Sequence, residues 1–249
     1  MSSPEEFALR LPRVHKALYL LFNGGYHGAS PDSPVRGEVC REAMRLVALL
    51  LRHPLGLAPA TYALSALMCL TAARLPGKIG PDGQLKRLAE QDRSLWDREL
   101  ILDGMGLLTE AGVGGEVSAY HFEAGIAAYH ATSPNWESTD GRAILSLYNE
   151  LLRMRPSPVI ALNRAIALAE AEGAEEGIKA IEAIEDKHRL KRYPYYYTGL
   201  GDLNSRMGRM DVARRNFLKA SELVESPAEQ RLLLGRVQDC LGDPGPSGS

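Results

Sequence analysis

Apolar residues recur three and four positions apart along nearly the whole chain, and they almost never alternate with polar ones. A period near 3.6 is typical of an amphipathic helix, whereas a half-buried strand needs a period of two. The sequence therefore predicts an all-α protein. Helices are expected over residues 13–22, 38–51, 60–73, 92–108, 117–131, 141–154, 158–172, 174–185, 194–207, 210–224 and 227–241, most of them bounded by Pro or Gly.

Two short segments interrupt this pattern. Residues 78–85 contain Pro81-Asp82-Gly83, which is a turn sequence between two short arms, so a small hairpin is expected there. Asn23-Gly24-Gly25 is expected to end the first helix, because glycine readily adopts the left-handed conformation found at helix C-termini.

The second half of the chain reads as antiparallel helix pairs joined by very short loops, the pattern of a solenoid. Large and small residues there follow the order of a tetratricopeptide repeat, and the matched small residues Gly177 and Ala213 are 36 positions apart, near the ~34-residue period. Gly201 and Ala165 would let paired helices approach closely. The sequence thus predicts a tetratricopeptide-like, right-handed superhelical solenoid. Its positions in the last full pair are Tyr197, Leu200, Gly201, Asn204, Gly208, Ala213, Phe217 and Ala220.

Three regions are expected along the chain. Residues 1–115 form a divergent N-terminal helical region that includes the hairpin near 78–85. Residues 116–241 form the tetratricopeptide-like pairs. Residues 242–249 are rich in Gly, Pro and Ser, which cannot bury apolar surface, so a disordered tail is expected there.

Composition excludes several classes of protein. The 29 Lys and Arg nearly balance the 31 Asp and Glu, so no global charge indicates a nucleic-acid or membrane partner. The three cysteines, Cys40, Cys69 and Cys240, have neither disulfide nor zinc spacing, and the first two are expected in the core. No secretory signal and no apolar run of about 20 residues is present, so a cytoplasmic protein without a membrane span is expected.

The segment from Glu90 to Asp97 is the strongest candidate for chemistry. Its carboxylates could serve acid–base catalysis or bind a small ligand. The structural alternative is that Asp92 caps a helix while Arg93 and Asp97, four positions apart, form an ion pair. We favour this alternative.

No cofactor or metal is expected. His121 and His130 are nine positions apart, so they lie on different faces of one helix and lack ligand spacing. Asn23-Gly24-Gly25 follows a helix instead of a strand, which is the wrong context for a nucleotide-binding loop.

Four landmark segments, at residues 10–26, 40–46, 90–97 and 157–165, occur in an order that resembles the C-terminal extension of bacterial extracytoplasmic-function (ECF) RNA polymerase sigma factors that carry a tetratricopeptide domain. The resemblance spans about residues 9–241. It implies a non-enzymatic regulatory domain whose partners are the sigma regions of the same full-length protein, RNA polymerase or a protein regulator. DNA would be contacted only through sigma regions that this chain lacks.

Charge is unevenly distributed in the second half. Residues 170–186 carry seven acids and one lysine, whereas residues 187–219 carry nine bases and two acids. The basic run could be a solvated face, a partner site or, with its tyrosines, a nucleic-acid site. We predict a protein-partner site with its rim at Arg189, Lys191, Arg192 and Tyr195. The concave helix face beside it would contribute Leu162, Ile166, Tyr195, Thr198, Asp202 and Ser205.

Overall fold

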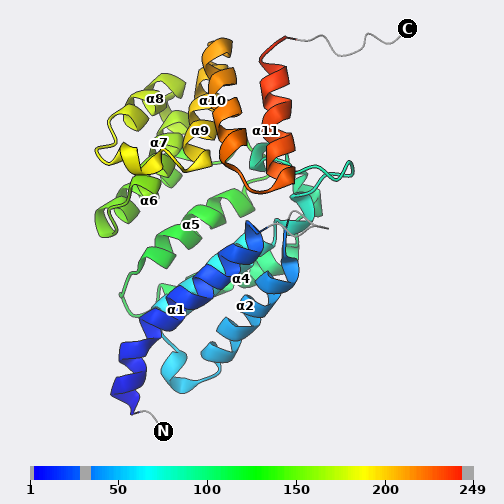
Figure 1. The fold of residues 1–249 in the computed structure, drawn as a ribbon. Helices are drawn as coiled ribbons and strands as arrows, with labels where there is room; N and C mark the ends of the chain where they lie inside the picture. Colours follow the sequence, from blue (N-terminus) through cyan, green and yellow to red (C-terminus); the bar gives the residue numbers. More distant parts are fainter. Residues whose placement is uncertain (1–2, 29–34, 243–249) are drawn as a thin grey trace. The chain divides into compact units, whose positions relative to one another are not determined.

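The computed structural model describes residues 3–28 and 35–242, and within these the protein is all-α (Figure 1). Eleven α-helices and five short 3₁₀ helices account for its regular structure, and no strand occurs in the described residues. The predicted hairpin is present in reduced form, because Ile79 and Leu85 form an isolated antiparallel bridge. The all-α prediction is confirmed.

The chain separates into two compact units between Thr139 and Asp140. The first unit contains α1 (Pro4–Tyr26), α2 (Gly37–Leu51), α3 (Pro59–Ala72), α4 (Arg98–Ala111) and α5 (Ala119–Thr132). Its 3₁₀ helices are η1 (Pro54–Gly56), η2 (Leu75–Gly77), η3 (Leu88–Glu90) and η4 (Arg93–Leu95).

Helix α3 lies at the centre of the first unit. It has almost no polar face, and helices that are apolar all round are buried. Leu64 and Met68 pack with α1 and α2, whereas Leu70 packs with α4 and α5. Its buried Thr61 hydroxyl lies 2.8 Å from Nε2 of His15 on α1, so the polar atoms of this core satisfy each other.

Helix α1 is longer than predicted. It runs through Asn23-Gly24-Gly25, so the expected helix end there is wrong. A Cβ at Gly25 would lie 2.9 Å from Sγ and N of Cys40, which shows that this glycine permits close approach of α2 instead of stopping α1. The helix also continues through Pro12, which has no N–H to donate. Near its start, the ring of Phe7 stacks on His53 with 5.2 Å between centroids.

The helix expected from residue 92 begins six residues later. Asp97 accepts a hydrogen bond from the backbone N–H of Leu100 and is the N-cap of α4, while Asp92 accepts from the N–H of Ser94 and caps only η4. Helix α5, which the repeat pattern grouped with later pairs, packs on α3 and α4 and belongs to the first unit.

The second unit contains α6 (Gly141–Met154), α7 (Pro158–Glu172), α8 (Ala174–Glu182), η5 (Lys187–Leu190), α9 (Pro194–Arg206), α10 (Met210–Leu223) and α11 (Pro227–Asp239). These helices agree with the predicted ranges to within three residues. Proline at the first position of α7, α9 and α11 explains where these three helices begin, because its fixed φ and missing N–H suit that position.

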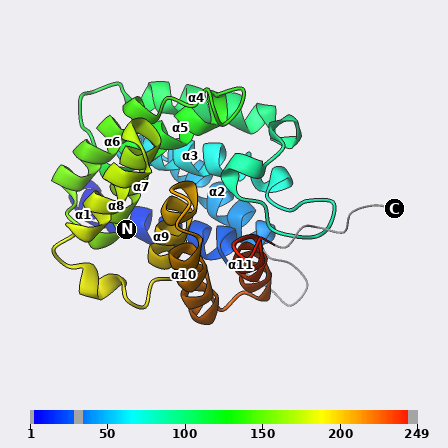
Figure 2. The same cartoon turned by 90° about the horizontal axis from the view of Figure 1, so that it is seen from above.

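Two apolar clusters hold the second unit together. Leu162, Ile181 and Leu203 are fully buried where α7, α8 and α9 meet. Phe217 is buried between α9, α10 and α11, and α10 and α11 pack side by side (Figures 1 and 2).

Two further expectations from the sequence concern the C-terminal tail and membrane spans. Of the predicted tail, residues 243–249 lie outside the described residues. Among the helices of residues 3–28 and 35–242, none combines the length and the hydropathy that crossing a bilayer requires.

Candidate functional site

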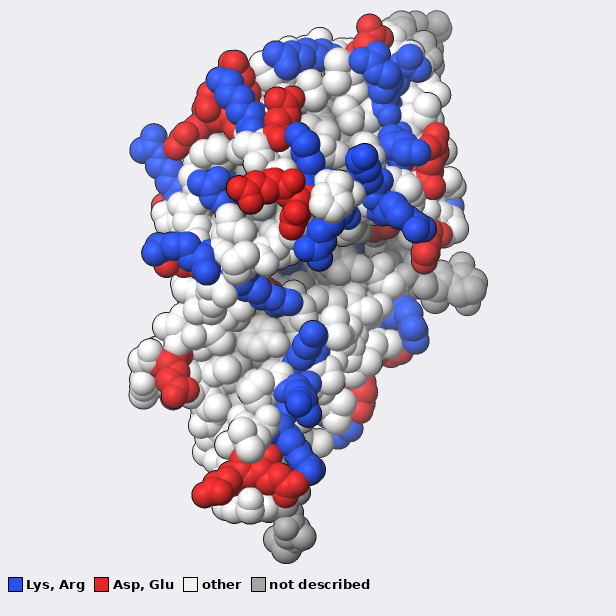
Figure 3. Space-filling model, turned by 60° about the vertical axis from the view of Figure 1, so that its left-hand side comes forward, with Lys and Arg blue, Asp and Glu red and all other residues white. Residues whose placement is uncertain are grey.

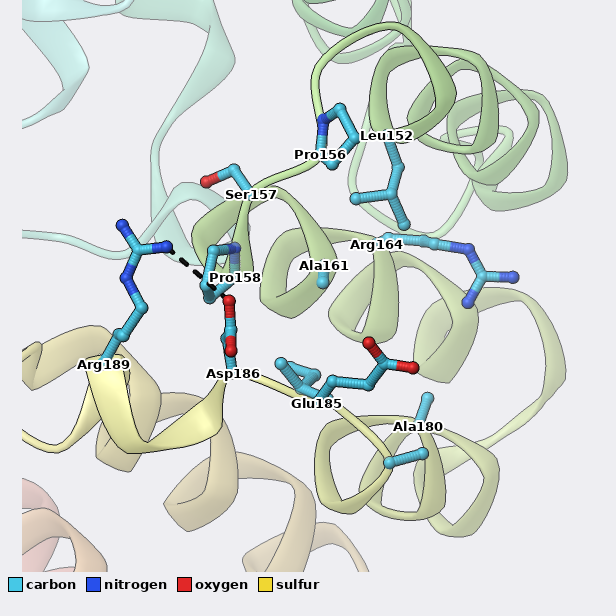
Figure 4. A pocket seen from close by; sticks show the side chains of 12 residues that line it. Leu152, Pro156, Ser157, Pro158, Ala161, Arg164, Ala180, Glu185, Asp186 and Arg189 are labelled. Atoms are coloured by element: carbon cyan, nitrogen blue, oxygen red, sulfur yellow. Dashed lines mark ion pairs between the residues drawn. The ribbon is translucent and has the colours of Figure 1, made fainter.

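The second unit contains a pocket of about 410 Å³ beside the start of α7 and the end of α8 (Figure 4). Its apolar lining is formed by Leu152, Ala161, Ala180, Ala183 and Ile184, together with Pro156 and Pro158 from the α6–α7 connection. Its polar lining is Ser157, Arg164, Glu185, Asp186 and Arg189. The pocket therefore has an apolar floor and charged side chains around it.

Local sequence explains why this space stays open. Pro156 and Pro158 enclose Ser157 in an extended connection, because the residue before a proline is disfavoured in the helical region. Small side chains follow on both helices, with Ala161 on α7 and Ala180 on α8. Without larger side chains at these positions, the helices leave a pocket that no residue of 140–242 fills.

The charged side chains stand on different sides of the pocket. Arg189 and Arg164 lie on opposite sides in Figure 4. Nε of Arg164 donates to Oδ1 of Asn149 at 2.6 Å, which orients its guanidinium. Arg189 and Asp186 form an ion pair at 3.7 Å, and both side chains are largely exposed, so solvent weakens the pair.

The pocket lies where the acidic and basic segments of the sequence meet. Glu185 and Asp186 are the last acids of residues 170–186, and Arg189 belongs to the basic run that follows. Figure 3, which brings the side of α8 and η5 forward, shows acidic and basic side chains next to one another on this surface. The change of charge sign at residues 186 and 187 is the sequence signal that could have located the pocket.

The predicted rim residues have different surroundings. Arg189 lines the pocket, while Lys191 and Arg192 are exposed and form no side-chain ion pair within the described part of the chain. Tyr195 is 37% exposed, and its hydroxyl donates to Oε1 of Glu229 at 2.8 Å. Burial and this carboxylate raise the pKa of Tyr195. Its hydroxyl is thus held by α11.

The predicted helix face is only partly available to a partner. Leu162 is fully buried, so its assignment to an open surface is wrong. Spacings of three and four place it on the same face as Ala165 and Ala169, which packs on α8. Ile166 is half-buried and approaches Gly199 of α9.

The remaining residues of that face lie on α9 and are half-buried. Asp202 pairs with Arg236 of α11 at 2.6 Å. The hydroxyl of Thr198 donates to the carbonyl of Pro194, and that of Ser205 lies 3.8 Å from Sδ of Met210. Most polar groups of this face therefore already have partners within the second unit.

The Glu90–Asp97 segment has structural roles in the first unit. Asp92 and Asp97 cap helices, and hydrogen bonds from Ser94 lower the pKa of Asp92. Glu90 pairs with Arg87. The predicted Arg93–Asp97 pair is absent, because Arg93 turns inward and donates to two carbonyls, those of His130 at 2.7 Å and Ser133 at 2.6 Å.

The histidines and cysteines do not gather into a site within the described residues. His121 bonds locally to Ser118 and the carbonyl of Ala111. The ring of His130 stacks on Trp136, and burial together with Arg74 and Arg93 lowers its pKa to about 4. Cys40 and Cys69 are buried, as expected for core residues.

Comparison with known proteins finds similarity to one family of unknown function and to one uncharacterized protein. Residues 10–112 match a family of unknown function, DUF6596, and this match lies within the first unit. An uncharacterized protein of Rhizobium meliloti (strain 1021) is 34% identical over 237 residues, which cover 95% of this chain and 55% of that protein. The chain thus spans little more than half of that relative's length. No solved structure matches the chain.

Proposed function

We propose that this chain is a non-enzymatic protein-interaction domain of an ECF-type RNA polymerase sigma factor, and that α6–α11 form a tetratricopeptide-like array. The proposal begins from the four landmark segments in the order typical of such extensions. Its partners are sigma regions, RNA polymerase or a protein regulator.

One observation supports the proposal of a tetratricopeptide-like array. Contacts between α7, α9 and α11 join residues at nearly constant separations in the sequence: Glu170 with Arg206 is 36 apart, while Tyr195 with Glu229 and Asp202 with Arg236 are each 34 apart. A repeat of about 34 residues brings equivalent positions of successive first helices together. The spacing of these side-chain contacts is what such an array requires.

Close contacts inside the pairs also involve small residues. A Cβ at Gly177 on α8 would lie 2.4 Å from Cβ of Ala169 on α7. In the following pair, Gly201 on α9 approaches the ring of Phe217 on α10. Small residues at helix–helix contacts allow close packing, so both pairs depend on the kind of position that defines the repeat.

An interaction role also agrees with the chemistry of the surface. Asp92 and Asp97, the carboxylates of the alternative enzyme or ligand-binding hypothesis, cap helices. The R. meliloti relative has 45% of its length outside the match, which leaves room for a further domain such as sigma regions. Because Asp92 and Asp97 already have a capping role, binding is favoured over catalysis.

A binding experiment tests this proposal. The tagged chain is immobilised and offered bacterial core RNA polymerase and, separately, the part of the R. meliloti relative outside the match. Binding of either at micromolar concentration is the expected result. Binding of neither, or failure of the full relative to direct promoter-specific transcription by core polymerase, would contradict it.

Binding to DNA provides a second test. The isolated chain should bind duplex DNA only weakly, with dissociation constants no tighter than about 10⁻⁴ to 10⁻⁶ M at physiological salt, and binding should weaken as salt increases. Fluorescence anisotropy with labelled duplexes measures this. Sequence-selective nanomolar binding would assign promoter recognition to this chain.

A further inference from the structure

We propose that the pocket between α7 and α8 binds one large apolar side chain of a partner polypeptide, with acidic partner residues over η5 and basic partner residues over the end of α8. This inference rests on the proposed interaction function and specifies the partner's chemistry. It predicts that the surface at residues 180–192 binds a partner segment in one orientation, which is set by charge.

The pocket's floor selects an apolar group. Ala161, Ala180 and Ile184 offer no hydrogen-bonding side chain, so a polar group that enters between them loses its water and can find a partner only among the polar residues at the sides of the pocket. A Leu, Met or Phe side chain would gain from burial instead. Deep anchors of this kind, surrounded by weaker contacts, supply most of the affinity at protein interfaces.

Charged side chains line the pocket around this floor, with Arg164 across from Arg189 (Figure 4), and further exposed charges of opposite sign lie on α8 and after η5. Glu182 and Glu185 are exposed at the end of α8, and Lys191 and Arg192 are exposed after η5. The side chains of these four residues form no ion pair with any described residue, so they are open to a partner. Asp186 and Arg189, at the boundary, form an ion pair at 3.7 Å that solvent weakens.

This arrangement fixes the orientation of an occupant. A segment whose apolar residue enters the pocket is attracted at one end to Lys191 and Arg192 and at the other to Glu182 and Glu185. Complementary charges at an exposed rim increase the encounter rate and reject wrongly charged partners. A uniformly acidic strand, including a nucleic-acid backbone, meets the carboxylates of Glu182 and Glu185 and is repelled by them.

Peptide selection tests the proposal without knowledge of the natural partner. A phage library of random 12-residue peptides is selected on the immobilised full chain, and the selected peptides are measured by fluorescence anisotropy. The expected peptides have a Leu, Met or Phe between an acidic and a basic end. No enrichment, or enriched peptides that lack this pattern, would overturn the proposal.

Pocket-filling variants locate the binding. Ala183→Trp places a ring in the pocket from an exposed position, and Ala180→Leu fills it from α8. Either should weaken the selected peptides at least tenfold, whereas Ala48→Trp, at an exposed site on α2, should change their affinity less than twofold. Thermal melts establish that each variant is folded. Folded variants that retain full affinity would overturn the proposal.

Charge variants test the polarity. Lys191→Glu with Arg192→Glu should weaken the selected peptides at least tenfold, and exchanging the peptides' acids for lysines should restore binding. The matched control is Arg209→Glu with Arg215→Glu, which reverses two exposed basic residues away from the pocket. Equal losses of peptide affinity in both double variants would contradict the inference.

The outcomes also separate this inference from the proposed function. If core polymerase or the relative's remaining part binds but Ala183→Trp leaves that binding intact and no peptide is selected, the pocket inference fails alone. If selected peptides bind in the pocket while neither protein binds, the sigma-factor proposal fails and the pocket inference stands.

Discussion

The ring of Phe217 lies directly against the backbone of Gly201, so that a Cβ at residue 201 would stand 2.5 Å from the ring's Cε1 atom. Real Cβ atoms do not approach other atoms so closely, and the ring is fully buried. This contact joins α9 to α10 and makes glycine a steric requirement at position 201.

Gly201→Ala should therefore destabilise the protein by about 1–3 kcal/mol, because overpacking forces the ring or the helices to shift. Gly235→Ala is the matched control, since a Cβ there meets nothing within 4 Å, and it should stabilise α11 by about 0.5–1 kcal/mol. Urea unfolding measures both. Phe217→Leu should recover part of the loss in the Gly201→Ala background, and equal effects at positions 201 and 235 would refute the packing.

Arg93→Ala should cost roughly 1–3 kcal/mol, because it removes the donor of the His130 and Ser133 carbonyls and the cation stacked on Trp96 at 4.8 Å. Arg98→Ala, an exposed arginine of the neighbouring α4, should change stability by less than about 0.5 kcal/mol. Thermal melts compare the two variants. A double-mutant cycle with Arg93→Ala and Asp97→Ala tests whether these two side chains interact. A measurable coupling energy would support the ion pair predicted from the sequence and contradict the inward orientation of Arg93.

His130 should make stability depend on pH between about 6.5 and 4. Its pKa is about 4 in the folded protein and near 6.5 when unfolded, so the unfolded chain binds the proton first as the pH falls. The stabilisation is complete above pH 6.5 and decreases down to pH 4, by roughly 2 kcal/mol because the half-buried ring keeps some solvent contact.

The variant His130→Phe checks this dependence while keeping a ring beside Trp136. Denaturation midpoints of the variant should fall less between pH 6.5 and 4.5 than those of the wild type. His188→Asn, at an exposed position, is the control and should retain the wild-type slope. Identical slopes for all three proteins would exclude His130 as the responsible group.

The Asp202–Arg236 pair should couple α9 to α11 by about 1–3 kcal/mol in a double-mutant cycle. Arg236 is only 14% exposed and lies over the ring of Phe217 at 4.4 Å, so solvent screens the pair poorly. The exposed Glu176–Lys179 pair on α8 should give less than about 0.5 kcal/mol. Equal coupling energies for the two pairs would show that burial does not strengthen the first.

The helices of the second unit could be predicted from sequence because local signals agreed there. Pro158, Pro194 and Pro227 each mark a helix start. The connections between the helices are short, so the positions of the helix ends can vary little. The predicted start of α4 is wrong because Asp92 and Asp97 are equally good N-cap residues when only the local sequence is considered. The inward bonds of Arg93 to α5, a tertiary contact, decide between them.

The site was less predictable for a similar reason. Leu162 was assigned to an open face, but the packing of α8 on α7 covers it. Charge predicts Arg189 as a rim residue, and this residue lines the pocket, whereas the pocket floor at Ala161 and Ala180 has no sequence signature. Small apolar residues look the same in a tight contact and beside an empty space, and only the positions of neighbouring helices distinguish the two.

The proline within α1 divides this helix into two parts that differ in the free energy of local opening. Pro12 cannot donate to the carbonyl of Ala8, so the turns before it are linked to the rest of α1 by fewer backbone hydrogen bonds. Leu9 is 80% exposed there, whereas Leu18 and Phe22 belong to the buried core. In deuterated solvent the amide hydrogens before Pro12 therefore exchange through local fraying, while those near Phe22 exchange only when the whole first unit opens.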